Sequence, residues 1–174
     1  MKQKRAIFFD RDGTLIFAPV DKNRKPKSIK NLCQIFIDIN TINLCKILSK
    51  KFLLFLFTNQ PEIPRKKNSK INVENINMYI KKKLNLKDVI TNYSDDEKDF
   101  YRKPNPGMIL FLAKKYNLKL DSSYVVGDRW RDIDAGNKAG CKTIFIEKKN
   151  YNERLNSKPD FKVKKIFQIL KHIK

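Results

Sequence analysis

Carboxylates, a lysine and a hydroxyl group occur in four short polar segments of this sequence. The segments are DRDGT (residues 10–14), TNQ (58–60), RKP (102–104) and GDRWRD (127–132). A carboxylate can attack phosphorus, and a second, displaced carboxylic acid can protonate the leaving oxygen. A lysine and a hydroxyl can stabilise the oxygens of the transferring group, and Mg²⁺ accepts carboxylate ligands. The set Asp10, Asp12, Thr58, Lys103 and Asp128 therefore suits phosphoryl transfer through an aspartyl-phosphate.

The positions of these segments relative to apolar runs suggest a shared site. Taken alone, each segment is also typical of an ordinary turn, cap or loop. However, Asp10 directly follows the run AIFF, Thr58 follows FLLFLF, and Asp128 follows YVVG. Ligands of open α/β sheets bind beyond the carboxyl ends of the strands. We therefore expect the four segments to meet at one edge of one sheet.

Short apolar runs alternate with amphipathic stretches, which is typical of a parallel sheet covered by helices. The patterns predict strands at residues 6–9, 52–57, 89–93, 124–126 and 142–146. They predict helices at 41–51, 73–84, 106–116, 133–138 and 161–173. The third helix is expected to have Asn105 as its N-cap and Pro106 at its first position. The expected fold is α/β, a doubly wound Rossmann-like parallel sheet, in a single domain over residues 1–174.

The single histidine excludes several classes of catalytic site. His172 lies two residues from the end of the 174-residue chain. A Ser-His-Asp triad, a Cys-His pair or a multi-histidine zinc site therefore cannot be assembled. We expect His172 to be a solvated residue in the last turn of a terminal helix.

The net charge of +21 comes mainly from lysine, because the chain has 31 Lys and 8 Arg. The lysines form short clusters at residues 22–30, 65–70, 81–83 and 162–165, where loops or exposed helix faces are expected. This pattern favours solvated faces and makes nucleic acid an unfavoured partner that is not excluded. Cys33, Cys45 and Cys141 form no CxxC pair and are typical of buried thiols in a reducing compartment. Because no apolar run reaches about 18 residues, we expect a cytoplasmic protein without a membrane partner.

The four segments together resemble the motifs of the haloacid dehalogenase (HAD) superfamily of phosphohydrolases. Those motifs read DxDGT, a hydroxyl residue at a strand end, a lysine, and GDxxxD; here they are DRDGT, TNQ, RKPNPGM and VGDRWRDIDAG. The resemblance extends from about residue 6 to residue 146. Within the superfamily, TNQ, RKPNPGM and GDRWRDIDAGNKAGCKT look like the branch of histidinol-phosphate and heptose-bisphosphate phosphatases.

The resemblance implies a catalytic role for each matching residue. It implies that Asp10 is the nucleophile and that Asp12 is the general acid and base. It also implies that Thr58 and Lys103 steady the transferring phosphoryl group. The residues implied to bind substrate are Asn59, Arg102 and Arg129.

A Mg²⁺ cofactor follows from the same resemblance. Asp10, Asp128 and the backbone carbonyl of Asp12 are implied to hold the ion. Asp132 is implied to orient either the water shell of the metal or Lys103.

Two segments depart from the pattern of this branch. Relatives often carry a zinc loop of Cys and His before the RKP motif, whereas residues 92–101 here read NYSDDEKDFY. We therefore expect no zinc, and a loop that is mobile or held by other contacts. After TNQ, the segment PEIPRK (61–66) replaces the more usual small residue, Gly and Ile-Ala-Arg-Gly. The intervals between motifs leave no room for a separate cap domain, so only loops such as residues 18–31 can close over the site.

Together these observations predict a Mg²⁺-dependent phosphomonoesterase that acts on a small phosphorylated metabolite. The expected substrate is a sugar phosphate or sugar bisphosphate, and the sequence does not separate it from histidinol phosphate. A polynucleotide 3′-phosphatase is a further alternative, because an uncapped cleft admits a polymer and the positive charge attracts it. A non-catalytic phosphate-binding domain is less favoured, because every catalytic position is filled. We expect the protein to be a monomer.

Overall fold

Six parallel strands form one sheet in the computed structural model, which describes residues 3–174. The order of the strands across the sheet is β3-β2-β1-β4-β5-β6. β1 therefore lies between β2 and β4, and the chain winds outward from it in both directions. The bounds of the strands are β1 Ala6–Phe9, β2 Leu53–Asn59, β3 Asp88–Asn92, β4 Tyr124–Gly127, β5 Lys142–Ile146 and β6 Phe161–Val163.

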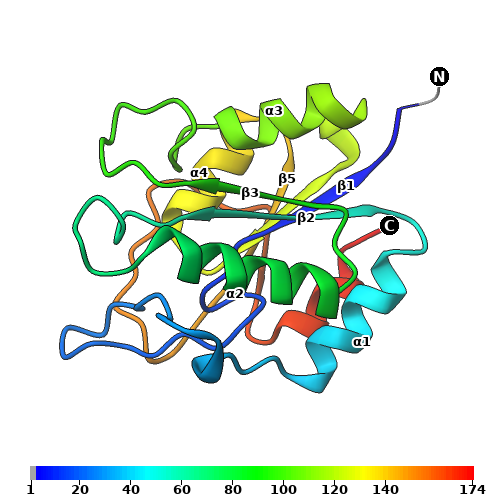
Figure 1. Cartoon of the computed structure of the whole chain (residues 1–174). Coiled ribbons are helices and arrows are strands. Elements are labelled where there is room, and N and C mark those ends of the chain that lie inside the picture. The colour runs from blue at the N-terminus through cyan, green and yellow to red at the C-terminus, as the bar shows by residue number, and fades with distance from the viewer. Residues whose placement is uncertain (1–2) are drawn as a thin grey trace.

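Helices cover both faces of this sheet (Figure 1). The α-helices are α1 Ile39–Leu48, α2 Lys70–Lys83, α3 Gly107–Tyr116 and α4 Trp130–Lys138. Short 3-10 helices lie at Leu32–Gln34, Leu120–Ser122 and Ile166–Lys171. The helices α1 and α2 pack on one face, and α3 and α4 pack on the other. The predicted α/β doubly wound fold is confirmed.

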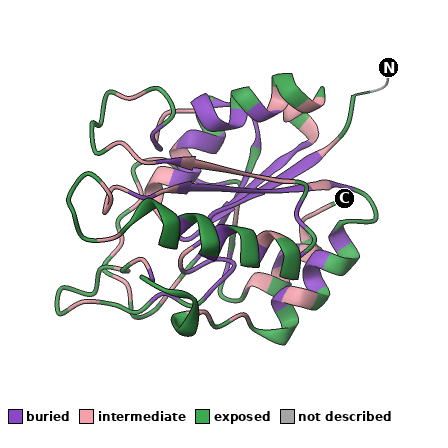
Figure 2. Cartoon of the chain, viewed as in Figure 1, coloured by how far each residue is buried: buried purple, intermediate pink, exposed green. Residues whose placement is uncertain are grey.

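The core consists of two apolar layers, one on each side of the sheet. Along β1, Ile7 and Phe9 point into the layer beneath α1 and α2, whereas Ala6 and Phe8 point into the layer beneath α3 and α4. All four side chains are fully buried, as expected for a central parallel strand. Figure 2 shows the buried sheet enclosed by helices with exposed outer faces. Because both faces of β1 are packed, the residue that follows it is fixed in position.

The carboxyl ends of β1, β2 and β4 lie side by side at the centre of the sheet. Here the winding changes direction, and an open crevice forms at such a switch point. The backbone N–H of Asp10 donates to the Val126 carbonyl at 3.0 Å, which joins the end of β1 to β4. The segments after these strands therefore emerge close together.

The predicted helix at residues 161–173 is wrong. Phe161 and Val163 instead pair with Ile144 and Ile146 as the edge strand β6, and the 3-10 helix Ile166–Lys171 follows. Val163 is buried and Lys162 is exposed, so the period of two suits an edge strand, and pairing with β5 overrides the helical pattern. His172 is half-buried, and its ring stacks on that of Phe161 with 4.5 Å between centroids. It is therefore not the solvated residue of a terminal helix that the sequence predicted.

Smaller corrections concern a helix end and a cysteine. Pro106 is the N-cap of α3, one residue later than predicted, because the Asn105 side chain donates instead to the Asp99 carbonyl at 2.9 Å. Cys45 and Cys141 are buried as expected, but Cys33 is exposed.

Among residues 3–174, no helix combines the length and apolar character needed to span a bilayer.

Asp88 connects the start of β3 to the end of α3. Its carboxylate accepts hydrogen bonds from Tyr116 Oη at 2.7 Å and from Lys115 Nζ at 2.8 Å. Partial burial alone would raise the pKa of Asp88, but these bonds outweigh burial and lower it from 3.8 to about 2. Ionised Asp88 therefore stabilises the fold.

We predict that Asp88→Asn lowers the free energy of unfolding by about 1 kcal/mol at neutral pH, and that this loss fades in acid. The folded pKa lies below the unfolded one, so the stabilisation is fully present above about pH 4 and is lost as the pH falls toward about 2. Urea unfolding of both proteins across this range measures the difference. As a control, Asp121→Asn removes an exposed carboxylate 3.8 Å from Lys119 Nζ and is expected to change little. A loss that stays constant with pH would contradict the assignment.

Candidate active site

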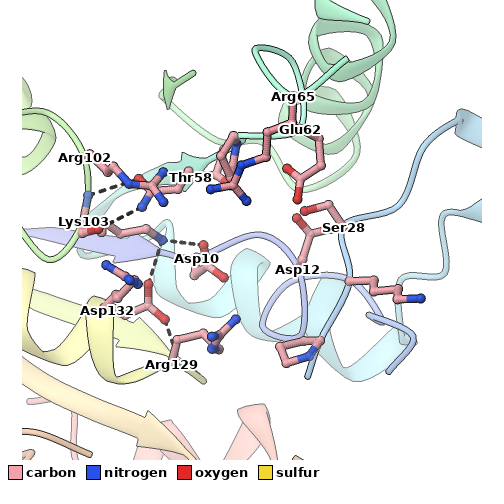
Figure 3. A pocket seen from close by; sticks show the side chains of 15 residues that line it. Asp10, Asp12, Ser28, Thr58, Glu62, Arg65, Arg102, Lys103, Arg129 and Asp132 are labelled. Atoms are coloured by element: carbon pink, nitrogen blue, oxygen red, sulfur yellow. Dashed lines mark hydrogen bonds and ion pairs between the residues drawn. The ribbon is translucent and has the colours of Figure 1, made fainter. Parts of the chain in front are cut away.

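The four predicted segments meet at a cavity of about 240 Å³ beyond the carboxyl ends of the strands (Figure 3). Eight of the residues predicted for the site line it: Asp10, Asp12, Thr58, Asn59, Arg102, Lys103, Arg129 and Asp132. Asp128, also predicted, is fully buried beside Asp10 and Asp132 and does not line the cavity. The other lining residues, which were not predicted individually as site residues, are Pro26, Lys27, Ser28, Pro61, Glu62, Arg65 and Arg131. All but Arg131 lie in the two segments, 18–31 and 61–66, that the sequence placed next to the site.

Lys103 lies at the centre of the site. Its Nζ donates to Asp10 Oδ1 at 2.5 Å, to Asp132 Oδ1 at 2.7 Å and to the Phe57 carbonyl at 3.1 Å. The side chain is buried, which alone would lower the pKa of Lys103, but the two carboxylates outweigh burial and raise it. The ammonium group therefore stays charged and fixes both carboxylates.

Three buried carboxylates form a cluster around this lysine. Oxygen atoms of Asp10, Asp128 and Asp132 lie within 4.8 Å of one another. Burial, and then repulsion from Asp132 and Asp12, raises the pKa of Asp10 to about 6 despite the opposing effect of Lys103. Burial and the neighbouring carboxylates also raise the pKa of Asp128 well above its ordinary value. The cluster thus carries more negative charge than Lys103 neutralises.

The donor set of this cluster fits a hard cation such as Mg²⁺. Asp128 Oδ1 accepts a hydrogen bond from Thr14 Oγ1 at 3.2 Å, but the buried Oδ2 has no hydrogen-bond partner among residues 3–174. A buried, unpaired carboxylate oxygen beside two further carboxylates is what an oxygen-preferring cation satisfies. Within this cluster, Asp10 and Asp128 are the residues best able to hold a metal, because both oxygens of Asp132 already accept hydrogen bonds, from Lys103 Nζ and from the Arg129 N–H.

The backbone at Gly13 passes so close to the Asp128 carboxylate that only glycine fits at this position. Its φ is +88°, a conformation that side chains disfavour, and a methyl group there would overlap Asp128 Oδ2. The same methyl group would lie 2.6 Å from the hydroxyl of Tyr151. Tyr151 comes from the loop after β5 and was not predicted to be near the site. No motif surrounds it in the sequence, so only the fold reveals it.

A buried arginine and a glutamine orient Asp12. Arg11 is fully buried and donates from Nε to Asp12 Oδ2 at 2.9 Å. The remaining donors of Arg11 bind Asn77 Oδ1 at 3.0 Å and Gln60 Oε1 at 2.8 Å. Gln60 Nε2 in turn donates to Asp12 Oδ2 at 3.1 Å and to Thr58 Oγ1 at 2.9 Å. Arg11 and Gln60 lie within the DRDGT and TNQ motifs, but the sequence gave no sign that either is buried.

Asn59 binds the segment that carries Lys103. Its Oδ1 accepts from the Lys103 backbone N–H at 3.1 Å, and its Nδ2 donates to the Lys103 carbonyl at 3.0 Å. Both ends of the amide are therefore occupied by the backbone. Asn59 lines the cavity, and these two contacts fix the backbone of Lys103.

Hydrogen bonds hold the loop at residues 92–101, which contains neither Cys nor His. Asn92 Nδ2 donates to Asp99 Oδ2 at 3.1 Å, and Arg102 Nη1 donates to the Ser94 carbonyl at 2.7 Å. Arg102 is buried against the loop, yet its Nε has no partner in the described part of the chain. Arg129 reaches the cavity from the start of α4, and its Nε donates to Glu153 Oε2 at 2.9 Å.

The chain is similar in sequence to known phosphatases. Residues 100–173 match the HAD-hydrolase-like family. Over 157 residues the chain is 30% identical to a D-glycero-alpha-D-manno-heptose-1,7-bisphosphate 7-phosphatase of Photorhabdus laumondii, which covers 83% of this chain and 82% of that protein. Over 154 residues it is 28% identical to the histidine biosynthesis bifunctional protein HisB of Blochmanniella floridana, which covers 85% of this chain and 42% of that protein.

The fold is also similar to a solved phosphatase structure. The D,D-heptose 1,7-bisphosphate phosphatase of B. bronchiseptica, complexed with magnesium and phosphate, matches with a TM-score of 0.78 at 20% identity. The match covers 97% of this chain and 99% of that chain. The similarity extends over the whole sheet and its helices.

We predict that Asp128→Asn stabilises the protein when no divalent cation is present. The comparison is made at a pH above the raised pKa of Asp128, where its carboxylate is ionised. There the substitution removes one charge from the crowded cluster and keeps an oxygen to accept the bond from Thr14. The melting temperature in EDTA should rise by about 2–4 °C for each kcal/mol of repulsion relieved. Added Mg²⁺ should raise it in the wild type and much less in the variant. Thermal unfolding with and without Mg²⁺ measures both effects. Asp96→Asn, an exposed aspartate, serves as the control, and a less stable Asp128→Asn in EDTA would refute the argument.

Proposed function

The chain belongs to the HAD-like hydrolases, in the branch of the heptose-bisphosphate phosphatases, and from this we propose that it is a Mg²⁺-dependent phosphomonoesterase with Asp10 as its nucleophile. The observation that carries the proposal is that Lys103 Nζ contacts two carboxylates, that of Asp10 directly after β1 and that of Asp132 in α4. The contact with Lys103 Nζ fixes Oδ1 of Asp10, whose carboxylate faces the cavity. We further propose that the chain works as a single domain without a cap, in the cytoplasm.

Asp10 performs the first chemical step. Because Lys103 Nζ binds Oδ1, Oδ2 is the oxygen that attacks the substrate phosphorus. A bond forms between Asp10 Oδ2 and phosphorus, and the bond from phosphorus to the leaving oxygen breaks. Lys103 and the hydroxyl of Thr58 stabilise the oxygens of the phosphoryl group as charge shifts between them.

Asp12 moves the protons in both steps. Its Oδ2 is bound by Arg11 and Gln60, whereas Oδ1 accepts only a long bond of 3.4 Å from the Ile29 N–H within residues 3–174. Oδ1 therefore gives a proton to the leaving oxygen in the first step. It then takes a proton from water as the water oxygen attacks phosphorus, which releases inorganic phosphate and restores Asp10.

The residues that would hold Mg²⁺ are Asp10, Asp128 and the backbone carbonyl of Asp12. When bound, the ion offsets the repulsion between the carboxylate nucleophile and the phosphate. Asp132 acts through its contacts with Lys103 Nζ at 2.7 Å and with the backbone N–H of Arg129 at 3.0 Å. Of the two roles expected for Asp132, these contacts support orientation of Lys103.

The proposed substrate is a sugar phosphate or sugar bisphosphate. Besides Lys103, four arginines and one further lysine line the cavity: Lys27, Arg65, Arg102, Arg129 and Arg131. Carboxylates of Asp10, Asp12, Glu62 and Asp132 line the same cavity and offset part of this charge. The arginines are nevertheless cationic donors in addition to Lys103, which suits a substrate with a second anionic group. The Arg102 Nε is a buried, unpaired donor at this place. The similarity to the Photorhabdus laumondii heptose-bisphosphate phosphatase supports the same substrate class.

Histidinol phosphate is the second candidate substrate. Glu62 lines the cavity across from Asp12, and its Oε2 is buried without a hydrogen-bond partner among residues 3–174 (Figure 3). An unpaired carboxylate oxygen suits the ammonium group of an amino alcohol phosphate. The similarity to the histidine biosynthesis protein of Blochmanniella floridana supports this alternative.

We predict that Asp10→Asn lowers Mg²⁺-dependent phosphate release by at least about 10³-fold, because the amide cannot form the aspartyl-phosphate. Release of inorganic phosphate from p-nitrophenyl phosphate measures the effect. The variant should retain the fold, since Asn preserves the size of the side chain and an acceptor for Lys103. Substantial turnover by a folded Asp10→Asn variant would exclude Asp10 as the nucleophile.

We predict that a sugar bisphosphate has the highest kcat/KM in a panel of phosphate esters. The panel contains sugar 1,7- and 1,6-bisphosphates, sugar monophosphates, histidinol phosphate and a 3′-phosphorylated oligonucleotide. Preference for histidinol phosphate that is lost in Glu62→Gln would support the second candidate. Preference for the oligonucleotide with a steep dependence on salt would favour the polynucleotide phosphatase alternative instead.

A further inference from the structure

Carboxylates of the loop at residues 92–101 form ion pairs with three of the arginines that line the cavity. Glu97 binds Arg131 through both oxygens, at 2.5 Å from Nη1 to Oε2 and 3.1 Å from Nη2 to Oε1. The same Oε1 accepts from Arg102 Nη2 at 3.3 Å. Asp95 Oδ2 lies 3.4 Å from Arg65 Nε. One glutamate thus joins two arginines that come from different parts of the chain.

Arg131 is fixed on two sides by this arrangement. Its guanidinium carbon lies 4.4 Å from the centre of the Trp130 ring, and Glu97 binds its Nη1 and Nη2 in a two-bond fork. The fork leaves the remaining N–H groups of Arg131 available to a ligand. Arg102 is held differently, by one bond to the Ser94 carbonyl and one to Glu97, and its Nε has no partner among residues 3–174.

The backbone of the loop is itself anchored, so Glu97 has a defined position. The Asn105 side chain donates to the Glu97 carbonyl at 3.4 Å and to the Asp99 carbonyl at 2.9 Å. The Glu97 side chain is half exposed, and its slight burial alone would raise its pKa. Arg131 and Arg102 outweigh that effect and lower the pKa of Glu97, so the carboxylate stays ionised.

Building on the proposed function, we propose that Glu97 is a positioning residue that fixes Arg131 and Arg102 to receive a second anionic group of the substrate. Guanidinium groups that converge on one cavity repel one another, and a shared carboxylate between two of them reduces that repulsion. A preorganised arginine binds an anion more tightly than a mobile one, because less side-chain freedom is lost on binding. The acidic loop therefore contributes to substrate selection without touching the reacting phosphoryl group.

Calorimetry in an Asp10→Asn background tests the proposal, because it measures binding without turnover. The ligands are fructose 1,6-bisphosphate, which has a second phosphate, and fructose 6-phosphate, which lacks one. Glu97→Gln should weaken binding of the bisphosphate about tenfold, the effect of losing one well-placed charged hydrogen bond. Binding of the monophosphate should change less than about twofold.

Asp96→Asn is the matched control. Asp96 lies beside Glu97 in the loop, is exposed, and forms no ion pair within the described residues, so its substitution makes the same change in net charge. This control should bind both ligands as the Asp10→Asn parent does. Unchanged or tighter bisphosphate binding by Glu97→Gln would overturn the proposal, since tighter binding would mean that Glu97 competes with the anion.

A kinetic measurement distinguishes positioning from a general structural effect. In the active chain, Glu97→Gln should raise KM for the bisphosphate and leave kcat for p-nitrophenyl phosphate within about twofold, because Asp10, Asp12 and Lys103 are untouched. A matching fall in kcat for both substrates would overturn the proposal. If the wild type releases no phosphate from any ester, the proposed function fails, but the calorimetric comparison still decides the role of Glu97.

Discussion

The balance between one buried ammonium group and three buried carboxylates determines the organisation of this protein. Lys103 Nζ contacts Asp10 and Asp132, while Asp128 lies within 4.8 Å of both and has an oxygen without a hydrogen-bond partner among residues 3–174. Burying charges of one sign close together is unfavourable unless opposite charge compensates. One lysine compensates only in part, as the raised pKa of Asp10 shows. Repulsion between these carboxylates therefore destabilises the folded chain, and the same repulsion gives the cluster its affinity for a cation.

The sheet makes this crowding possible. β1 is packed on both faces and bonded to β2 and β4, so its end cannot move away from theirs to relieve repulsion. Gly13 lets the backbone turn beside Asp128, and Asn59 fixes the backbone of Lys103 from the end of β2. The packed and paired centre of the sheet thus holds the repelling carboxylates in place. The arginines that line the cavity, in contrast, are paired with carboxylates of loop segments.

The sequence predicted the parts of the molecule that depend on local pattern. Apolar runs located β1, β2 and β4, and polar residues directly after them located the site, because parallel strands end at a common edge. It failed at residues 161–173, where the apolar spacing also suits a helix and only the free edge of β5 makes β6 favourable. The burial of Arg11 and the pairing of Glu97 with Arg131 were not predictable, because each depends on segments distant in sequence. The catalytic roles assigned to the nine site residues remain predictions.

The network around Arg11 limits how this chain can change over time. The fully buried guanidinium binds Asp12, Gln60 and Asn77, which belong to three separate segments. Loss of any one partner leaves a charged donor or a polar acceptor unpaired in the interior, so single substitutions at these positions are disfavoured in any background that retains the others. Exposed ion pairs such as Lys70–Glu74 and Lys119–Asp121, in contrast, leave no buried group unpaired when one partner is lost. Exposed positions are therefore expected to accept substitutions more readily than the residues around Arg11. There, a substitution at one position is expected to require a compensating substitution at another.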